Sequence, residues 1–129
     1  MGDILLAKKL YRRAFIQSIP LSKSRLFARG FNQAEMIAKF FKSSLGLETG
    51  NFLIRKKDIP FQAELSSRAQ RYKNIKGSFK LIPNANVKDK TIILVDDVVT
   101  TGATCVEAGR ILKAAGCRKV YVLSLARSS

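Results

Sequence analysis

Two adjacent carboxylates, Asp96 and Asp97, stand between an apolar run and a loop of threonines around one glycine. Paired acids of this kind suit the hydroxyl groups of a sugar, or a hydrated Mg²⁺. The loop leads into a helix predicted from Cys105 to Ala115, and a helix N-terminus offers free N–H groups and a positive pole to a phosphate. The residue types and their spacing therefore predict a site for a sugar phosphate.

The apolar run Thr91–Val95 must position these groups, and its β-branched content predicts a strand buried on both faces of a parallel sheet. Open α/β sheets bind ligands at the carboxyl ends of such strands. Strand and helix patterns alternate along residues 1–129, which predicts a single α/β domain with a mainly parallel central sheet flanked by helices. Gly109, inside the helix 105–115, is expected to allow close approach to that sheet. The other predicted strands are 15–20, 51–55, 79–82 and 119–125; the other predicted helices are 4–14, 31–45 and 67–76; the predicted loops are 21–30 and 56–62.

The predicted helix 31–45 carries clear start and stop signals. Asn32 can cap it, Glu35 can complete a capping box, and Phe31 can pack onto Met36. Gly46 is expected to end it. Five residues at helical spacing predict an apolar face toward the core: Ala34, Ile37, Ala38, Phe41 and Leu45.

The charge balance of the chain is strongly basic, with 24 Lys and Arg against 9 Asp and Glu and a formal charge of +15. Such a charge predicts attraction to polyanions such as nucleic acid or nucleotides, although solvated basic faces are also common. Two cysteines and no histidine exclude Cys₄ and Cys₂His₂ zinc sites and histidine-based catalytic triads. Both cysteines are expected to be buried or free thiols. No signal peptide or long apolar run is visible, so a soluble, cytoplasmic protein without membrane insertion is expected.

Other interpretations of Asp96 and Asp97 fit the sequence less well. Carboxylates in an ordinary turn at a strand end would each need solvent or a partner behind four apolar residues. A Walker B strand also ends in acids, but it requires a Gly-x-x-x-x-Gly-Lys-Ser/Thr loop, and no pair of glycines here has that spacing. A phosphoacceptor of a receiver domain would not stand this late in the chain before a threonine–glycine loop.

The stretch Val95–Thr104 resembles the phosphoribosyl pyrophosphate (PRPP) motif of type I phosphoribosyltransferases, which is an apolar strand, two acids and a Thr-Thr-Gly loop. More of the chain is similar to one branch, the ComF/GntX family of competence-associated phosphoribosyltransferase-like proteins. The resemblance runs from about Ile16 to the end, and it implies the type I phosphoribosyltransferase fold. Its matching pieces are Pro20–Arg29, Arg29–Ala34, Arg55, Gln62, Leu65, Arg71, Asn74, Gly77, Phe79 and Leu123–Arg127.

The resemblance also implies roles for individual residues. Asp96 and Asp97 would bind the ribose hydroxyls of PRPP and act as the catalytic carboxylates. The segment that binds ribose 5-phosphate would be Val98, Val99, Thr100, Thr101, Gly102, Ala103 and Thr104. The pyrophosphate loop would be Ser22, Lys23, Ser24 and Arg25. The mobile loop that closes over the site would contribute Lys56, Lys57, Arg68 and Arg71.

Mg²⁺ is the cofactor that the resemblance implies. It would bridge oxygens of PRPP, with no direct protein ligand and with water between the metal and Asp96 or Asp97. The implied reaction is transfer of phosphoribosyl from PRPP to a nitrogenous acceptor, in a protein linked to competence and DNA uptake.

The alternative is a non-catalytic module of the DNA-uptake machinery that binds single-stranded DNA or a nucleotide. Its partner would be a helicase-like competence protein, and formation of a homodimer is a further alternative. Members of the family usually carry a cysteine-rich, zinc-ribbon-like segment before this core. That segment is missing from this sequence, so we expect either a fragment or a shortened member.

Overall fold

The computed structural model describes residues 14–21, 26–28, 30–56, 75–99 and 102–127; for 97–99 and 125–127 it describes the backbone alone. The predicted helix 4–14 and nearly all of the predicted helix 67–76 lie outside these ranges. Within them, four parallel strands form one sheet in the order β2 (Glu48–Thr49), β1 (Phe15–Ser18), β5 (Thr91–Val99) and β6 (Lys119–Arg127). The predicted class, a parallel central sheet flanked by helices, is confirmed.

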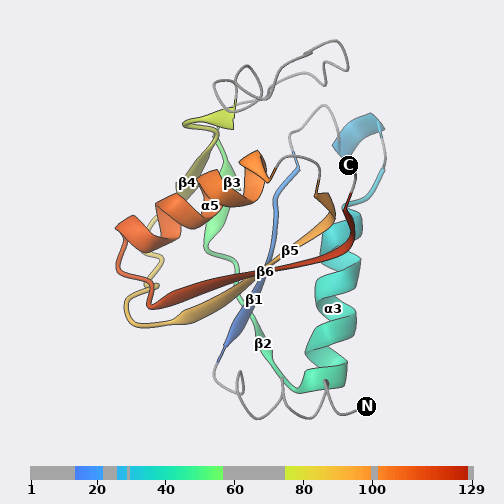
Figure 1. Cartoon of the computed structure of the whole chain (residues 1–129), viewed down its shortest axis with the longest axis horizontal. Coiled ribbons are helices and arrows are strands. Elements are labelled where there is room, and N and C mark those ends of the chain that lie inside the picture. The colour runs from blue at the N-terminus through green and yellow to red at the C-terminus, as the bar shows by residue number, and fades with distance from the viewer. Residues whose placement is uncertain (1–13, 22–25, 29, 57–74, 100–101, 128–129) are drawn as a thin grey trace.

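Two crossover units build this sheet, and they run in opposite directions from its centre. The unit β1–α3–β2, with α3 at Gln33–Leu45, moves outward on one side, and the unit β5–α5–β6, with α5 at Ala103–Ala114, moves outward on the other. Because parallel crossovers are right-handed, the two helices cover opposite faces of the sheet (Figure 1). Each helix has its own core. One joins Ile16, Ala34, Ala38, Leu45, Ile93 and Val95; the other joins Ile92, Leu94, Cys105, Ala108 and Leu112.

Strand β5 is the centre of the molecule and extends further than its apolar run predicts. Its residues Ile92 to Val95 point alternately to the two cores, and all four are buried. The ladder with β6 then continues through Asp96, paired with Ser124, to Val99, paired with Arg127. The acids therefore lie within the strand, because backbone pairing does not stop where the side chains become polar.

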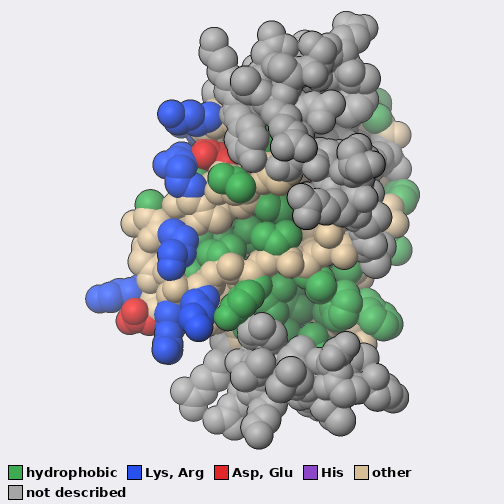
Figure 2. Space-filling view, viewed as in Figure 1, with side chains coloured by type: hydrophobic (Ala, Val, Ile, Leu, Met, Phe, Trp, Pro, Cys, Tyr) green, Lys and Arg blue, Asp and Glu red, His purple; other side chains and the backbone are tan. Residues whose placement is uncertain are grey.

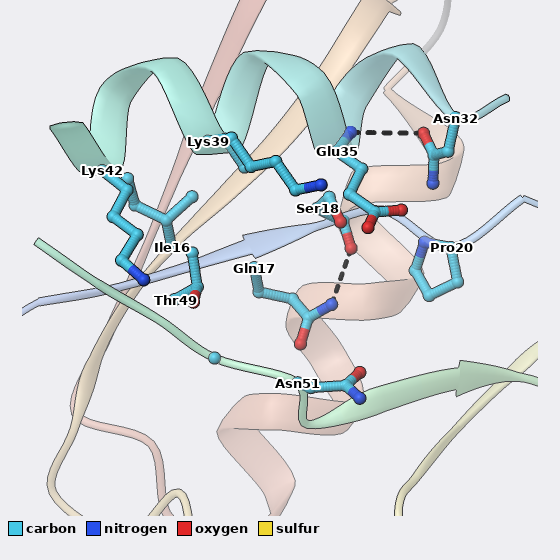
Figure 3. A pocket seen from close by; sticks show the side chains of 12 residues that line it. Ile16, Gln17, Ser18, Pro20, Asn32, Glu35, Lys39, Lys42, Thr49 and Asn51 are labelled. Atoms are coloured by element: carbon cyan, nitrogen blue, oxygen red, sulfur yellow. Dashed lines mark hydrogen bonds between the residues drawn. The ribbon is translucent and has the colours of Figure 1, made fainter. Parts of the chain in front are cut away.

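Helix α3 follows its predicted cap Asn32 and ends at Gly46 as predicted, but the Glu35 carboxylate points toward Pro20 and does not complete the predicted capping box (Figure 3). The Asn32 side chain accepts hydrogen bonds from the N–H groups of Ala34 (3.0 Å) and Glu35 (3.4 Å). Gly46 adopts φ 68° and donates to the Lys42 carbonyl. Asn32 also donates through Nδ2 to the Ile19 carbonyl at 3.1 Å, so the same side chain fixes the helix to the end of β1.

Three local predictions need correction. Residues Leu26 to Ala28, predicted as loop, form a helical turn that Gly30 closes by donating to the Leu26 carbonyl. Strands β3 (Leu53–Arg55) and β4 (Phe79–Leu81) lie outside the parallel sheet and pair antiparallel with each other, because they bury Leu53 and Phe79 in the core beneath α5. A Cβ on Gly109 would meet Val120 Cγ1 at 3.7 Å, an ordinary contact, so close approach does not require glycine there.

Two further observations complete the fold. Cys105 and Cys117 are both free and buried, as predicted. Among the residues that the structure describes, no helix is long and apolar enough to cross a membrane.

Candidate functional site

The carboxyl end of β1 lies beside Val95 of β5, directly before the two acids, at the point where the two crossover units diverge. Ser18 pairs with Val95, and the Ile19 N–H donates to the Val95 carbonyl at 2.9 Å. The loops that follow these strands therefore leave from the same edge of the sheet. A divergence of this kind is where open α/β sheets bind ligands. The predicted pyrophosphate loop, 22–25, lies outside the described residues, but the chain enters it three residues after β1 ends.

Asp96 is partly buried at this edge and faces the first turn of α5. The Cys105 thiol donates weakly to Asp96 Oδ2 at 3.9 Å. Burial, and then the negative charge of Asp96, raise the pKa of Cys105 to about 12. The thiol is therefore protonated at neutral pH, which makes it a weak nucleophile. Of Asp97, Val98 and Val99 the structure describes the backbone, which continues β5.

The N-terminus of α5 follows directly. Gly102 is its N-cap with φ 81°, a left-handed conformation that favours glycine, and its carbonyl accepts the first helical bond from Val106. Among the residues that the structure describes, no side chain caps this end of the helix. Ala103 is buried and Thr104 is partly buried. The structure thus brings Asp96, Gly102, Ala103 and Thr104 together at one strand-to-helix junction, and Thr100 and Thr101 lie outside the described residues.

Helix α5 also holds the chain where it returns from the predicted mobile loop. The buried Glu107 accepts a hydrogen bond from the Gly77 N–H at 3.1 Å and two from Arg110, each at 2.7 Å. The bond from Arg110, aided by Gly77, lowers the pKa of Glu107 against the effect of burial. Lys56, at the start of the loop, is exposed, and its N–H donates to the Ser78 carbonyl. Lys57, Arg68 and Arg71 lie outside the described residues.

Sequence patterns alone did not identify Glu107 as an anchor. Its i, i+3 spacing to Arg110 was the available signal, but that spacing is common on solvated helices. The bond to Gly77 joins residues 30 positions apart, so only the tertiary structure reveals it.

A hollow lies on the other side of β1 from β5, along the outer edge of β1 beneath α3 (Figure 3). It has a volume of about 450 Å³ and a polar wall. Its floor includes Gln17, a buried side chain that donates to the Ser18 carbonyl at 2.6 Å and accepts from the Phe52 N–H at 2.7 Å. No sequence motif predicted this pocket.

Comparisons with known proteins agree with the geometry. The family described as phosphoribosyl transferase domain matches residues 43–128. Competence protein F of Haemophilus influenzae is 30% identical over 111 residues, which are 85% of this chain and 48% of that protein. DNA utilization protein YhgH of Escherichia coli O157:H7 is 34% identical over 114 residues, which are 88% of this chain and 49% of that protein.

This chain belongs to the phosphoribosyl transferase domain family, in its ComF branch. Its fold agrees with that assignment. A hypoxanthine phosphoribosyltransferase of Staphylococcus aureus superposes with a TM-score of 0.60 over 98% of this chain and 60% of that one, at 10% identity. This ComF-branch chain spans about half the length of these curated relatives.

Proposed function

We propose that this domain binds PRPP with Mg²⁺ at the carboxyl end of β5 and transfers its phosphoribosyl group to a nitrogenous acceptor, in a protein of DNA uptake. One observation carries the proposal. The strand that bears the acids runs into the N-terminus of α5 through a left-handed glycine, at the point where the two crossover units diverge. This junction lies inside the segment that matches the family. The names of the relatives support the link to DNA uptake.

Each group at the junction has a role in this proposal. Asp96 and Asp97 would accept hydrogen bonds from the ribose hydroxyls. The N–H groups at the start of α5, together with Thr100, Thr101 and Thr104, would bind the 5′-phosphate. The loop after β1, with Lys23 and Arg25, would face the pyrophosphate from the neighbouring strand. The loop between β3 and β4, anchored by Glu107, would close over the site.

The donors at the junction fit Mg²⁺. Asp96 and Asp97 offer carboxylate oxygens and the threonine loop offers hydroxyl oxygens, and Mg²⁺ prefers oxygen ligands. When bound, the ion supplies positive charge to the pyrophosphate.

The reaction requires no nucleophile from the protein. The bond between the anomeric carbon and the pyrophosphate oxygen breaks as the acceptor nitrogen forms its own bond to that carbon. Positive charge develops on the ribose and negative charge on the departing pyrophosphate. Carboxylates near the ribose and cations near the pyrophosphate stabilise these charges, and a closed loop excludes water.

Calorimetry of the full chain with PRPP and Mg²⁺ tests this proposal. We expect binding in the micromolar range, and a loss of about 100-fold or more in the double variant Asp96→Asn, Asp97→Asn, because hydrogen bonds to charged groups are among the strong ones. Glu48→Gln, which changes an exposed acid on β2, is the matched control and should bind as the wild type does. A folded wild-type protein that does not bind PRPP would overturn the proposal.

A second function, binding of single-stranded DNA, is favoured by one surface. Lys and Arg side chains gather over α5 and the start of β6 (Figure 2). Arg110, Lys113, Arg118 and Lys119 are all exposed there. If this surface binds along a DNA backbone, the logarithm of the affinity for single-stranded DNA should fall linearly with the logarithm of the salt concentration. The slope should be about 0.7 per phosphate contacted.

The variant Lys113→Gln, Arg118→Gln, Lys119→Gln should reduce that slope by about two. A helicase-like competence protein would be the partner that delivers the strand. Absent binding, or binding that salt does not change, would remove this second function.

A further inference from the structure

We propose that the polar pocket along β1 and α3 is a second ligand site, for a nucleotide held by its phosphate. Strand β5 pairs with one edge of β1 and the pocket opens along the other, so β1 separates the pocket from the acids of β5. At one end the pocket reaches Ser18 and Pro20, which lead into the predicted pyrophosphate loop. A nucleotide here could be free or one unit of a single strand, and both present the same phosphate and sugar chemistry.

The pocket exists because β2 is short. It pairs with β1 at Phe15 and Ile16 only, and the chain then turns away through Gly50, whose N–H donates to the Ile16 carbonyl at 2.8 Å. A Cβ on Gly50 would lie 2.1 Å from the Phe52 ring, so glycine lets the chain leave without displacing that ring. In the described part of the chain, no strand covers the edge of β1 beyond Ile16.

Gln17 takes the place of the missing strand at this edge. Its side chain is 3% exposed and makes one bond to the Ser18 carbonyl and one to the Phe52 N–H. The two bonds hold the amide in one orientation. The floor of the pocket is therefore preformed, and the charged groups that line the pocket lie on its rim.

Helix α3 supplies charge from one side of the pocket. Glu35, Lys39 and Lys42 are spaced i, i+4 and i+7, so they share one face of the helix. Figure 3 shows the Lys42 ammonium group toward Thr49, and the Glu35 carboxylate toward Pro20. Within the residues that the structure describes, neither ammonium group pairs with a carboxylate. Two unneutralised cations over one polar hollow favour an anion.

The arrangement of these groups points to the kind of anion. Lysine ammonium groups bind phosphate as point charges, and two lining residues can donate hydrogen bonds: Thr49, beside Lys42, and Asn51, beside Gln17 (Figure 3). The carboxylate at the opposite end favours hydroxyl or amino donors and opposes a second anionic group. A volume of about 450 Å³ lies within the range of small-molecule sites. A phosphate carried on a nucleoside meets all three conditions.

The experiment is an NMR titration of the full chain with thymidine 5′-monophosphate, followed at the amide signals of Thr49 and Asn51. We expect saturable shifts, and about tenfold weaker binding in Lys39→Gln, Lys42→Gln. The matched control Lys80→Gln, Lys88→Gln removes the same charge from exposed positions elsewhere, and its affinity should stay within twofold of wild type. The variant Asp96→Asn, Asp97→Asn should also bind thymidine 5′-monophosphate with an affinity within twofold of wild type, as measured at these signals. That result would separate this site from the PRPP site.

Two further ligands complete the test. Inorganic phosphate should bind more weakly than the nucleotide, and Glu35→Gln should narrow that difference because it removes the end that recognises the nucleoside. If the Lys39→Gln, Lys42→Gln variant weakens binding of an oligothymidylate as much as binding of the mononucleotide, the pocket accepts a nucleotide within a strand. Equal loss in the two lysine variants, equal affinity for phosphate and nucleotide, or no shift at Thr49 and Asn51 would each overturn the proposal.

Discussion

The two crossover units of this domain share a topology and differ in how completely they are built. The unit β5–α5–β6 has two nine-residue strands and a helix that buries Ala108 and Leu112 completely. The unit β1–α3–β2 has strands of four and two residues, and α3 leaves Met36 and Phe40 more than half exposed. The complete unit fixes a strand end against a helix N-terminus. The incomplete unit leaves an open strand edge, and that edge is what creates the second pocket.

This contrast separates two ways of making a binding site. At the end of β5, the position of Asp96 and of the first turn of α5 follows from the sheet itself. Along β1, the site depends on a strand that stops early and on Gln17, which satisfies the backbone groups left there. A site of the first kind should resist changes in its surroundings better than a site of the second kind.

The largest expected effect compares the cores of the two units. Leu112→Ala removes a side chain with 0% exposure at the centre of α5, and we expect it to reduce the free energy of unfolding by about 3–5 kcal/mol. Leu45→Ala, on the last residue of α3 at 7% exposure, should cost about 2 kcal/mol, because the end of a helix can relax around the change. Urea unfolding of both variants measures the difference. Equal losses would show that the two units are equally well packed.

A smaller effect should come from the anchor that joins α5 to the turn before β4. Glu107→Gln removes the charge that Arg110 and Gly77 stabilise, so it should lower the urea midpoint at pH 7 by less than Leu112→Ala does. The pKa of Glu107 is lowered in the folded state, so its contribution to stability is present above about pH 4.5 and is lost as the pH falls through the folded pKa. Wild type and variant should therefore converge in strong acid. A difference in urea midpoint between wild type and Glu107→Gln that is the same at pH 7 and pH 3 would contradict this account. Glu48→Gln is the control.

The smallest effect concerns reactivity rather than stability. Cys105 should react slowly with iodoacetamide at pH 8, because burial and Asp96 raise its pKa to about 12. Asp96→Asn should speed the reaction only modestly, since burial is the larger cause and remains. The raised pKa also means that stability should fall from about pH 9 toward pH 12, as the unfolded thiol ionises first. Peptide mapping separates Cys105 from Cys117, and rapid native labelling of Cys105 would contradict the prediction.

Sequence patterns predicted the elements whose signals are local. The apolar run of β5, the capping residue Asn32 and the terminating Gly46 each determine structure through neighbours a few residues away. The family resemblance then predicted a site at the strand-to-helix junction, which lies inside the segment that matches the family, and the roles of its residues stay predictions. Residues 22–25 and most of the predicted mobile loop lie outside the described residues, so their roles stay predictions.

Features that depend on contacts between distant residues could not be predicted in this way. A three-residue strand such as β3 or β4 has the same pattern whether it joins a parallel sheet or an antiparallel pair. The hydrogen bonds from the Phe52 N–H to Gln17 and from the Gly77 N–H to Glu107 join residues at least 30 positions apart. The second pocket results from the early end of β2, and Glu48 and Thr49 carry no signal for it.

The most direct test of the central claim is an NMR titration of PRPP with Mg²⁺ into the Lys39→Gln, Lys42→Gln protein, in which the second pocket is weakened. If the end of β5 holds a ribose 5-phosphate, the largest shifts should occur at the backbone amides of Asp96, Gly102, Ala103 and Thr104. Those at Thr49 and Asn51 should be small. Shifts that spare Gly102, Ala103 and Thr104 would contradict the account.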